Sequence, residues 1–322
     1  MFRYFLTDKH EERSLSIRTL RFLLSFPCEL SALKDCRVAP FKIKQRTLRG
    51  SVSAAGIGLF TGEKISITLC PAEANSGIVF KRVDLPEQPV LPARSDYVQA
   101  TPRCTIIGSG NVIVQTVEHL LAALRAYNID NILIEISGGE VPIFDGSSRH
   151  FVELIEKAGI CELDVERELY RLRAPIFWSQ GDTHLIALPC DEYRISYTLH
   201  YPHSSTIGTQ FYSFVLDQER FKNEIASCRT FSIYEEIALM IEKGLVKGGS
   251  LENAIIIKGD AIVNPEGLRF PDEMARHKIL DLIGDLSLVP PFLAHVVAVR
   301  SGHASNNAFA KELLNHIKME NM

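Results

Sequence analysis

The sequence predicts an α+β protein made of two domains of similar topology, each a β-sheet layered with two helices. A chain of 322 residues is long for one hydrophobic core and comfortable for two. Strand-like segments followed by helical segments occur twice along the chain. A charged run at 162–168, typical of a solvated linker, separates the two occurrences. The expected domains are therefore 44–165 and 166–322.

The first half begins with three short strands that alternate or carry β-branched residues between Gly, Pro and Asn breaks: 50–54, 64–69 and 77–82. Apolar residues at helical spacing then predict a helix over 116–127, with Thr116 as its N-cap. A buried strand over 130–136 and a second helix ending at Gly159 complete this half.

The second half repeats this order with longer helices. Its first strands are expected at 171–178, 184–188 and 194–201. Three helices and two intervening strands follow: helices over 232–243, 272–285 and 306–318, and strands over 254–263 and 295–301.

Composition excludes several classes of protein. The 46% hydrophobic and 23% charged fractions are ordinary for a folded soluble chain. Apolar runs fall short of the roughly 20 residues that span a bilayer, so no transmembrane segment is expected. The net charge of -4 is opposite in sign to that of a dedicated nucleic-acid binder. Seven cysteines without a CxxC pair are typical of reduced thiols in a cytoplasmic protein.

Residues 1–43 differ from the rest, with 8 Lys/Arg against 5 Asp/Glu and a weak amphipathic character. The segment is not expected to be a secretory signal, because charges interrupt its apolar region. It is not expected to be a transit peptide either, because it contains acidic residues. We expect a mobile extension or a misassigned start, with a membrane-surface helix as the alternative.

One helical face in the second half carries titratable groups. His277, Asp281 and Asp285 lie at i, i+4 and i+8, and drift only about 80° around a helix. Either they form a functional face with an imidazole and two carboxylates, or they are an exposed acidic face with an incidental histidine.

Glu118 and His119 favour the functional interpretation. They lie in the first turn of an otherwise apolar helix, where such a pair is costly unless it is used or exposed. Adjacent residues point about 100° apart, so one can ligate a metal while the other reaches a bound water. His303 lies in a Gly-Ser loop before a helix, from which it can enter a cleft. Two histidines and one carboxylate form a hydrolytic zinc site, but also the ligand set of non-haem iron oxygenases.

A series of motifs along the chain matches one known family. The most specific of them are, in this order, TVEHLLAAL, RHKILDLIGD and SGHASNN. From about 45 to 317 the sequence resembles the UDP-3-O-acyl-N-acetylglucosamine deacetylase family. The resemblance implies an active site between helical layers, one catalytic Zn²⁺ and hydrolysis of the N-acetyl group of UDP-3-O-acyl-N-acetylglucosamine. That reaction is the committed step of lipid A synthesis in the cytoplasm, and transient contact with the inner membrane surface is compatible with it.

Position by position, the resemblance implies roles for nine residues. Glu118 is the catalytic glutamate and His303 the catalytic histidine, which Asp285 orients and charges. Either Glu118 or His303 protonates the leaving amine. The zinc ligands fall on His119, His277 and Asp281, the oxyanion donor on Thr230, and substrate contacts on Phe231 and Lys278.

Two further features bear on the substrate. Phe60 stands in GIGLF where the family usually has histidine, which predicts altered contacts at the diphosphate. An apolar stripe within 232–244 is an ordinary core-facing stripe or, as the resemblance implies, part of an inserted unit near 230–262 that forms the acyl passage. A non-haem iron oxygenase and a catalytically inactive binding protein on the same fold are the rival hypotheses.

Overall fold

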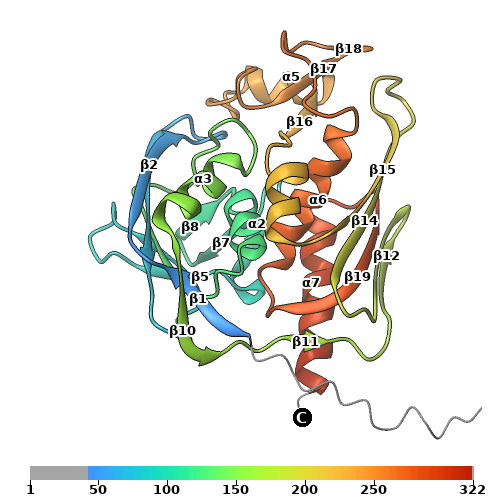
Figure 1. The fold of residues 1–322 in the computed structure, drawn as a ribbon. Helices are drawn as coiled ribbons and strands as arrows, with labels where there is room; N and C mark the ends of the chain where they lie inside the picture. Colours follow the sequence, from blue (N-terminus) through green and yellow to red (C-terminus); the bar gives the residue numbers. More distant parts are fainter. Residues whose placement is uncertain (1–42, 321–322) are drawn as a thin grey trace, which may run out of the picture. The chain divides into compact units, whose positions relative to one another are not determined.

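The structure is a computed structural model and describes residues 43–320. Two sheets with the same strand order organise the protein (Figure 1). The first sheet has the order β2-β3-β9-β4-β5 and the second β12-β13-β19-β14-β15, with β11 added on β19. In each sheet the strand latest in sequence lies in the middle, antiparallel to one neighbour and parallel to the other. The predicted α+β class with two similar halves is therefore confirmed.

The strands of the first sheet are β2 (Val52–Ile57), β3 (Lys64–Pro71), β4 (Ile78–Arg82), β5 (Val90–Pro92) and β9 (Ile132–Ile136). Those of the second are β11 (Tyr170–Arg171), β12 (Ile176–Gln180), β13 (Thr183–Leu188), β14 (Tyr193–Tyr201), β15 (Gly208–Val215) and β19 (Phe292–Val299). In the central strands β9 and β19, buried and half-buried residues alternate strictly, as expected for strands with one face against the core.

The helices lie between the two sheets in Figure 1. They are α2 (Glu118–Ala126), α3 (Arg149–Ala158), α6 (Glu273–Leu286) and α7 (His303–Glu320), with a short α4 (Gln218–Arg220). Helix α6 packs on β14 and β15, α7 on β12 and β13, and α3 on β2, while α2 contacts α6 directly. Single turns of 3-10 and π helix lie at Ser95–Tyr97 and Phe221–Ile225.

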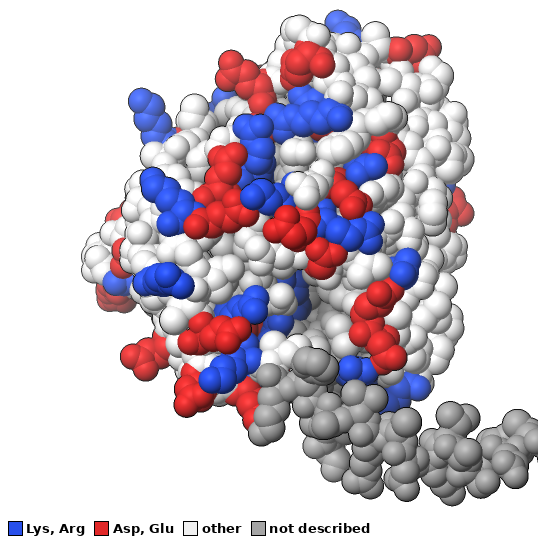
Figure 2. Space-filling view, viewed as in Figure 1, with Lys and Arg blue, Asp and Glu red and all other residues white. Residues whose placement is uncertain are grey.

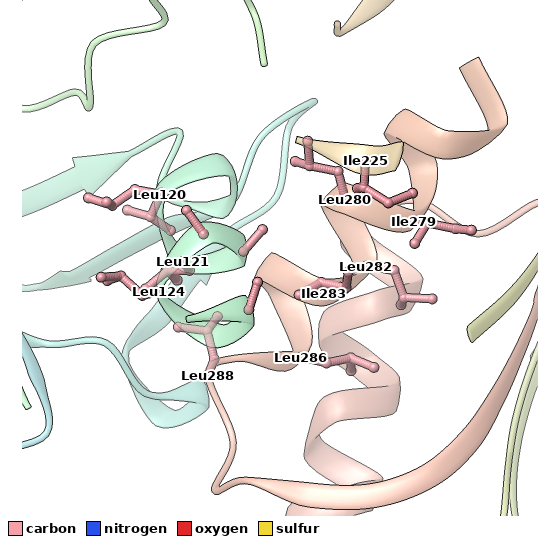
Figure 3. Close-up of a cluster of buried hydrophobic side chains, with 14 of the residues drawn as sticks. Leu120, Leu121, Leu124, Ile225, Ile279, Leu280, Leu282, Ile283, Leu286 and Leu288 are labelled. Carbon is pink, nitrogen blue, oxygen red and sulfur yellow. The ribbon is translucent and has the colours of Figure 1, made fainter. Parts of the chain in front are cut away.

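The contact between α2 and α6 is the apolar centre of the protein. Leu120, Leu121 and Leu124 of α2 and Ile283 and Leu286 of α6 are fully buried on the two helices (Figure 3). At Gly284 the helices approach so closely that an added Cβ would lie 2.1 Å from the carbonyl oxygen of Glu118. Glycine is therefore needed here to bring the first turn of α2 against the last turn of α6.

The charged run at 162–168 is not the solvated linker that we expected. Residues Ile160–Glu166 form strand β10, which pairs antiparallel with β1 (Lys44–Leu48). The charges face opposite charges across the pair: Lys44 Nζ lies 3.0 Å from Asp164 and Arg46 3.2 Å from Glu162. Cross-strand pairs of opposite charge stabilise a strand that its composition alone would not indicate.

Other element boundaries also differ from the predictions. Thr116 is not an N-cap, because α2 begins at Glu118 and Thr116 has a φ of 58°. The strand expected over 254–263 is a hairpin of β17 (Ile255–Lys258) and β18 (Ala261–Ile262), which turns at Gly259 with a φ of 55°. The helix expected from residue 232 is preceded by strand β16 (Phe231–Ile233) and is α5 (Tyr234–Glu242). The strands not foreseen, besides β1, β5, β10, β15 and β16, are β6 (Val98–Ala100), β7 (Ile106–Ser109) and β8 (Val112–Gln115).

The surface seen in Figure 2 carries lysine and arginine interleaved with aspartate and glutamate. That face therefore lacks the continuous basic surface typical of a nucleic-acid binder. Among the described residues, no helix combines the length and the apolar character that crossing a membrane requires. The expected boundary between 44–165 and 166–322 stays a prediction, and the expectations for residues 1–43 concern a segment that lies outside the described residues, Ile43 excepted.

Candidate active site

Three candidate metal ligands meet where α2 packs against α6. His119 comes from the first turn of α2, and His277 and Asp281 lie one turn apart on α6. Asp281 Oδ1 is 3.5 Å from His119 Nε2 and 3.3 Å from His277 Nε2, and all three residues are buried. The alternative of an exposed acidic face on α6 is therefore wrong.

The protonation of these ligands suits a cation. His277 Nδ1 lies 3.1 Å from the carbonyl oxygen of Cys228, to which it can only donate, so Nε2 carries the lone pair that faces Asp281. Burial lowers the pKa of His277 to about 3, which keeps the ring neutral. Asp281 Oδ1 is buried and has no hydrogen-bond partner among the described residues. The lone pair of His277 Nε2 and the unpartnered Asp281 Oδ1, grouped with His119, fit a metal ion.

Glu118 lies beside this cluster in a buried position. Its Oε2 accepts a hydrogen bond of 3.1 Å from the backbone N–H of Thr105, and its Oε1 is 3.7 Å from His303 Nε2. Burial raises the pKa of Glu118, while the His303 and His119 imidazoles act in the opposite direction. A carboxylate whose pKa lies above its ordinary value is suited to act as a base near neutral pH.

His303 is held by Asp285 on the opposite side of its ring. His303 Nδ1 lies 2.9 Å from Asp285 Oδ2, and Asp285 is fully buried. Although burial opposes the charged form, Asp285, followed by Glu118 and Asp281, raises the pKa of His303 to about 10. His303 is the first residue of α7 and does not lie in the preceding loop as predicted, so its backbone is fixed by the helix.

Sequence reasoning missed the residues around Asp285. Thr105 Oγ1 donates to Asp285 Oδ1, and the side-chain amides of Asn306 and Asn307 also donate to this carboxylate. The two asparagines belong to the SGHASNN motif, so the sequence could have indicated them as site residues. The sequence could not indicate Thr105, because its partner Asp285 is 180 positions away.

Thr230, Phe231 and Lys278 line one cavity with His119 and Asp281. The backbone N–H of Thr230 donates to Gly146 O at 2.8 Å, and the Phe231 ring stands edge-on to His277 at 6.4 Å. Lys278 Nζ donates to Asp281 Oδ2 at 2.8 Å and lies 5.5 Å from the centre of the Phe231 ring. Burial opposes the charge of Lys278, but Asp281 raises its pKa well above the ordinary value.

The cavity has a volume of about 840 Å³ and two kinds of wall. Its apolar wall comes largely from the segment 231–263, through Ile237, Met240, Ile241, Val246, Leu251 and Val263. Its polar wall comes from the second sheet and the start of α7, with Trp178, Gln180, Thr183 and Arg300, none of which the sequence indicated as site residues.

Phe60 also lines the cavity, on a loop fixed by a buried carboxylate. Glu140 accepts hydrogen bonds of 2.9 Å from the backbone N–H groups of both Phe60 and Thr61. At Gly58 an added Cβ would lie 2.4 Å from Glu140 Oε2, so glycine allows the loop to close over this carboxylate. The Phe60 ring is therefore held at the cavity by its own backbone.

A buried group of two histidines and an aspartate, with a glutamate and a charged histidine beside it, is typical of a metal-dependent hydrolase. The ligands lie on helices, whereas an iron oxygenase of the jelly-roll type would place them on strands. Residues 45–315 match the model of the UDP-3-O-acyl N-acetylglycosamine deacetylase family, and the chain belongs to that family.

Relatives that carry the name UDP-3-O-acyl-N-acetylglucosamine deacetylase are similar over nearly their whole length. The protein of Chlamydia pneumoniae is 51% identical over 277 residues, which cover 85% of this chain and 98% of the relative. That of Chlamydia abortus is 52% identical over 84% of this chain and 96% of its own. For Chlamydia trachomatis serovar L2 the identity is 49%, over 86% of this chain and 96% of the relative.

Proposed function

We propose that this protein hydrolyses the N-acetyl group of UDP-3-O-acyl-N-acetylglucosamine to give the free amine and acetate, the committed step of lipid A synthesis. The observation that supports this most directly is the buried group of His119, His277 and Asp281, with Glu118 and His303 beside it in one cavity. The names of the relatives supply the substrate.

The metal in this proposal is Zn²⁺, held by His119 Nε2, His277 Nε2 and a carboxylate oxygen of Asp281. Two neutral imidazoles and one carboxylate are a ligand set of catalytic zinc sites, which keep further positions open. When bound, zinc supplies Lewis-acid polarisation of the acetamide carbonyl and lowers the pKa of water to about 7.

Glu118 acts in this proposal as the general base. Its carboxylate faces the same space as the ligands, and the N–H of Thr105 fixes the orientation of its side chain. It takes a proton from the water that attacks the acetamide carbonyl. A base positioned in this way contributes roughly 10²–10⁴-fold to the rate.

Protonated His303 stabilises the negative charge that develops on the carbonyl oxygen, and Thr230 donates a hydrogen bond to the same oxygen. Preorganised donors of this kind are effective because they need no reorganisation during the reaction. Asp285 holds the His303 ring by Nδ1 and favours its charge, so that Nε2 faces the cavity with a proton. That proton, or the one taken by Glu118, passes to the leaving amine.

The two walls of the cavity suggest how the substrate lies. The acyl chain occupies the apolar wall formed by the unit near 230–262, and the sugar nucleotide lies along the polar wall with Lys278 and Phe231 beside the sugar. Phe60 offers an apolar ring where a histidine would offer a hydrogen bond, so we expect a weaker contact with the diphosphate at this position.

We also propose that the protein works in the cytoplasm and touches the inner membrane transiently. The five cysteines within the described residues are free thiols, as a reducing compartment favours. Near the apolar end of the cavity, Leu239 and Leu245 are 59% and 52% exposed and could contact lipid. Flotation with phospholipid vesicles tests this contact, and Leu239→Ser should reduce it.

The test of the function is zinc-dependent release of acetate from UDP-3-O-acyl-N-acetylglucosamine. Chelation should abolish release and stoichiometric Zn²⁺ should restore it, with metal content measured on the same samples. A folded, zinc-loaded protein that releases no acetate would overturn the proposal, and oxygen uptake with an iron-loaded sample would favour the oxygenase.

A further inference from the structure

Thr105 lies immediately before β7 and contacts two carboxylates of the proposed mechanism, that of the base Glu118 and that of Asp285, which orients His303. Its side chain is fully buried and does not line the cavity. Its hydroxyl donates to Asp285 Oδ1 at 2.5 Å, and its backbone N–H donates to Glu118 Oε2 at 3.1 Å. One residue of the first half thus connects Glu118 on α2 with Asp285 on α6.

The direction of these hydrogen bonds is fixed by their partners. Asn307 Nδ2 can only donate, and it lies 3.0 Å from Thr105 Oγ1, so the hydroxyl proton is left for Asp285. The other carboxylate oxygen, Oδ2, lies 2.9 Å from both His303 Nδ1 and Asn306 Nδ2. Donors on both oxygens prevent the Asp285 carboxylate from rotating about its Cβ–Cγ bond.

We propose that Thr105 is a positioning residue, whose hydroxyl holds the Asp285 carboxylate in the plane that keeps His303 Nε2 directed at the reacting atoms. The proposal rests on the function proposed above. Without this hydroxyl, Oδ1 loses its shortest donor, the carboxylate can turn, and the hydrogen bond to His303 Nδ1 lengthens. Because His303 Nε2 lies only 3.7 Å from Glu118 Oε1, a small rotation of the ring displaces the acid relative to the base.

The first test compares Thr105→Val, which keeps the shape and removes the hydroxyl, with Thr105→Ser, which keeps the hydroxyl. In Thr105→Val we expect kcat to fall by at least about tenfold, with KM and zinc content unchanged, because misplaced catalytic groups affect the transition state more than binding. Thr105→Ser should stay within about threefold of the wild type. A kcat for Thr105→Val within about twofold of the wild type would overturn the proposal.

Thr47→Val is the matched control for a purely structural loss. Thr47 is also buried, and its hydroxyl accepts a hydrogen bond of 2.9 Å from Ala72 N without contacting the site. Both valine variants should lose thermal stability, but Thr47→Val should keep the wild-type kcat. Equal losses of kcat per folded molecule in the two variants would mean that the effect of Thr105 is structural only.

Coupling to His303 tests the route of the effect. In a His303→Ala background, Thr105→Val should lower kcat by less than about twofold further, because the residue through which Thr105 acts is already absent. The same fold loss in both backgrounds would contradict this route.

A measurement without turnover separates this proposal from the proposed function. In protein labelled with ¹⁵N-histidine, the Nδ1–H resonance of His303, identified by its absence in His303→Ala, should be present in the wild type and Thr105→Ser. It should shift or disappear in Thr105→Val, and an unchanged resonance would overturn the proposal. A wild type that releases no acetate would overturn the function alone, since the resonance still reports on Thr105.

Discussion

Replacing Gly284 with alanine tests whether the close approach of α2 and α6 builds the site. The added Cβ would lie 2.1 Å from the carbonyl oxygen of Glu118 and 2.8 Å from its Cα, whereas real Cβ contacts are essentially never below 3.0 Å. The obstructing atoms are backbone, so they cannot swing aside as a flexible side chain would. The helices must therefore separate by about 1 Å, and the apolar contact in Figure 3 must open with them.

This separation should lower both the stability of the protein and its kcat. Overpacking of a core costs about 1–3 kcal/mol, and a backbone clash belongs at the upper end, at about 3 kcal/mol. At about 1.5–2 °C per kcal/mol for a chain of this size, the melting temperature should fall by roughly 4–6 °C. Because Glu118 and His119 move with α2, a displacement of about 1 Å should lower kcat by about 10²-fold.

The assay is thermal unfolding together with acetate release per folded molecule. Gly50→Ala is the control, because no atom lies within 4 Å of the added Cβ and its φ is outside the left-handed region. Its melting temperature should change by less than about 2 °C. A Gly284→Ala protein with the stability and kcat of the wild type would refute the argument that this glycine sets the distance between the helices.

Four further predictions concern the site and the N-terminal segment. Glu118→Ala should retain zinc but lower kcat by roughly 10²–10⁴-fold. In metal analysis, His277→Ala should lose zinc, and the control His203→Ala, at an exposed histidine, should keep it. Loss of zinc in Glu118→Ala and its retention in His277→Ala would contradict these roles. The basic limb of the pH–rate profile should report His303 losing its proton, and Asp285 raises the pKa of His303. Asp285→Asn should therefore move this limb to lower pH, and an unmoved limb would remove Asp285 from the mechanism. Deleting residues 1–43 should leave kcat/KM unchanged for long-chain and short-chain substrates, because the family match begins at residue 45; a selective loss above about tenfold for the long chain would contradict this.

The sequence predicted the elements whose hydrophobic pattern is local and strong. Helices α2 and α6 lie within two residues of their expected bounds, and α3 ends at Ala158, next to the expected Gly159. Strand β10 was missed because its charges are satisfied by partners on β1, about 120 positions away in sequence. Thr116 was misjudged as a cap because only the three-dimensional structure shows its left-handed backbone, from which its hydroxyl reaches Glu140.

The residues of the candidate site also divide into those that the sequence predicted and those that it could not. Spacing on one helix placed His277, Asp281 and Asp285 on a common face. Polar residues in an apolar helix and a Gly-Ser segment singled out Glu118, His119 and His303, and the resemblance added Thr230, Phe231 and Lys278. Neither could indicate Thr105, whose partners Asp285 and Asn307 are 180 and 202 positions away. Hydrogen bonds at such distances in sequence depend on how the halves pack, and single-sequence patterns do not contain that information.

The origin of the site residues explains why the packing matters for chemistry. Glu118 and His119 come from the first half, whereas His277, Asp281, Asp285 and His303 come from the second. The proposed base Glu118 and the proposed acid His303 lie 3.7 Å apart only if α2 and α6 are held in one register. Gly284 permits the approach, and Thr105 joins the two carboxylates across it. The contact between the halves is thus itself part of the catalytic geometry, and substitutions there should lower kcat before they change the affinity for substrate.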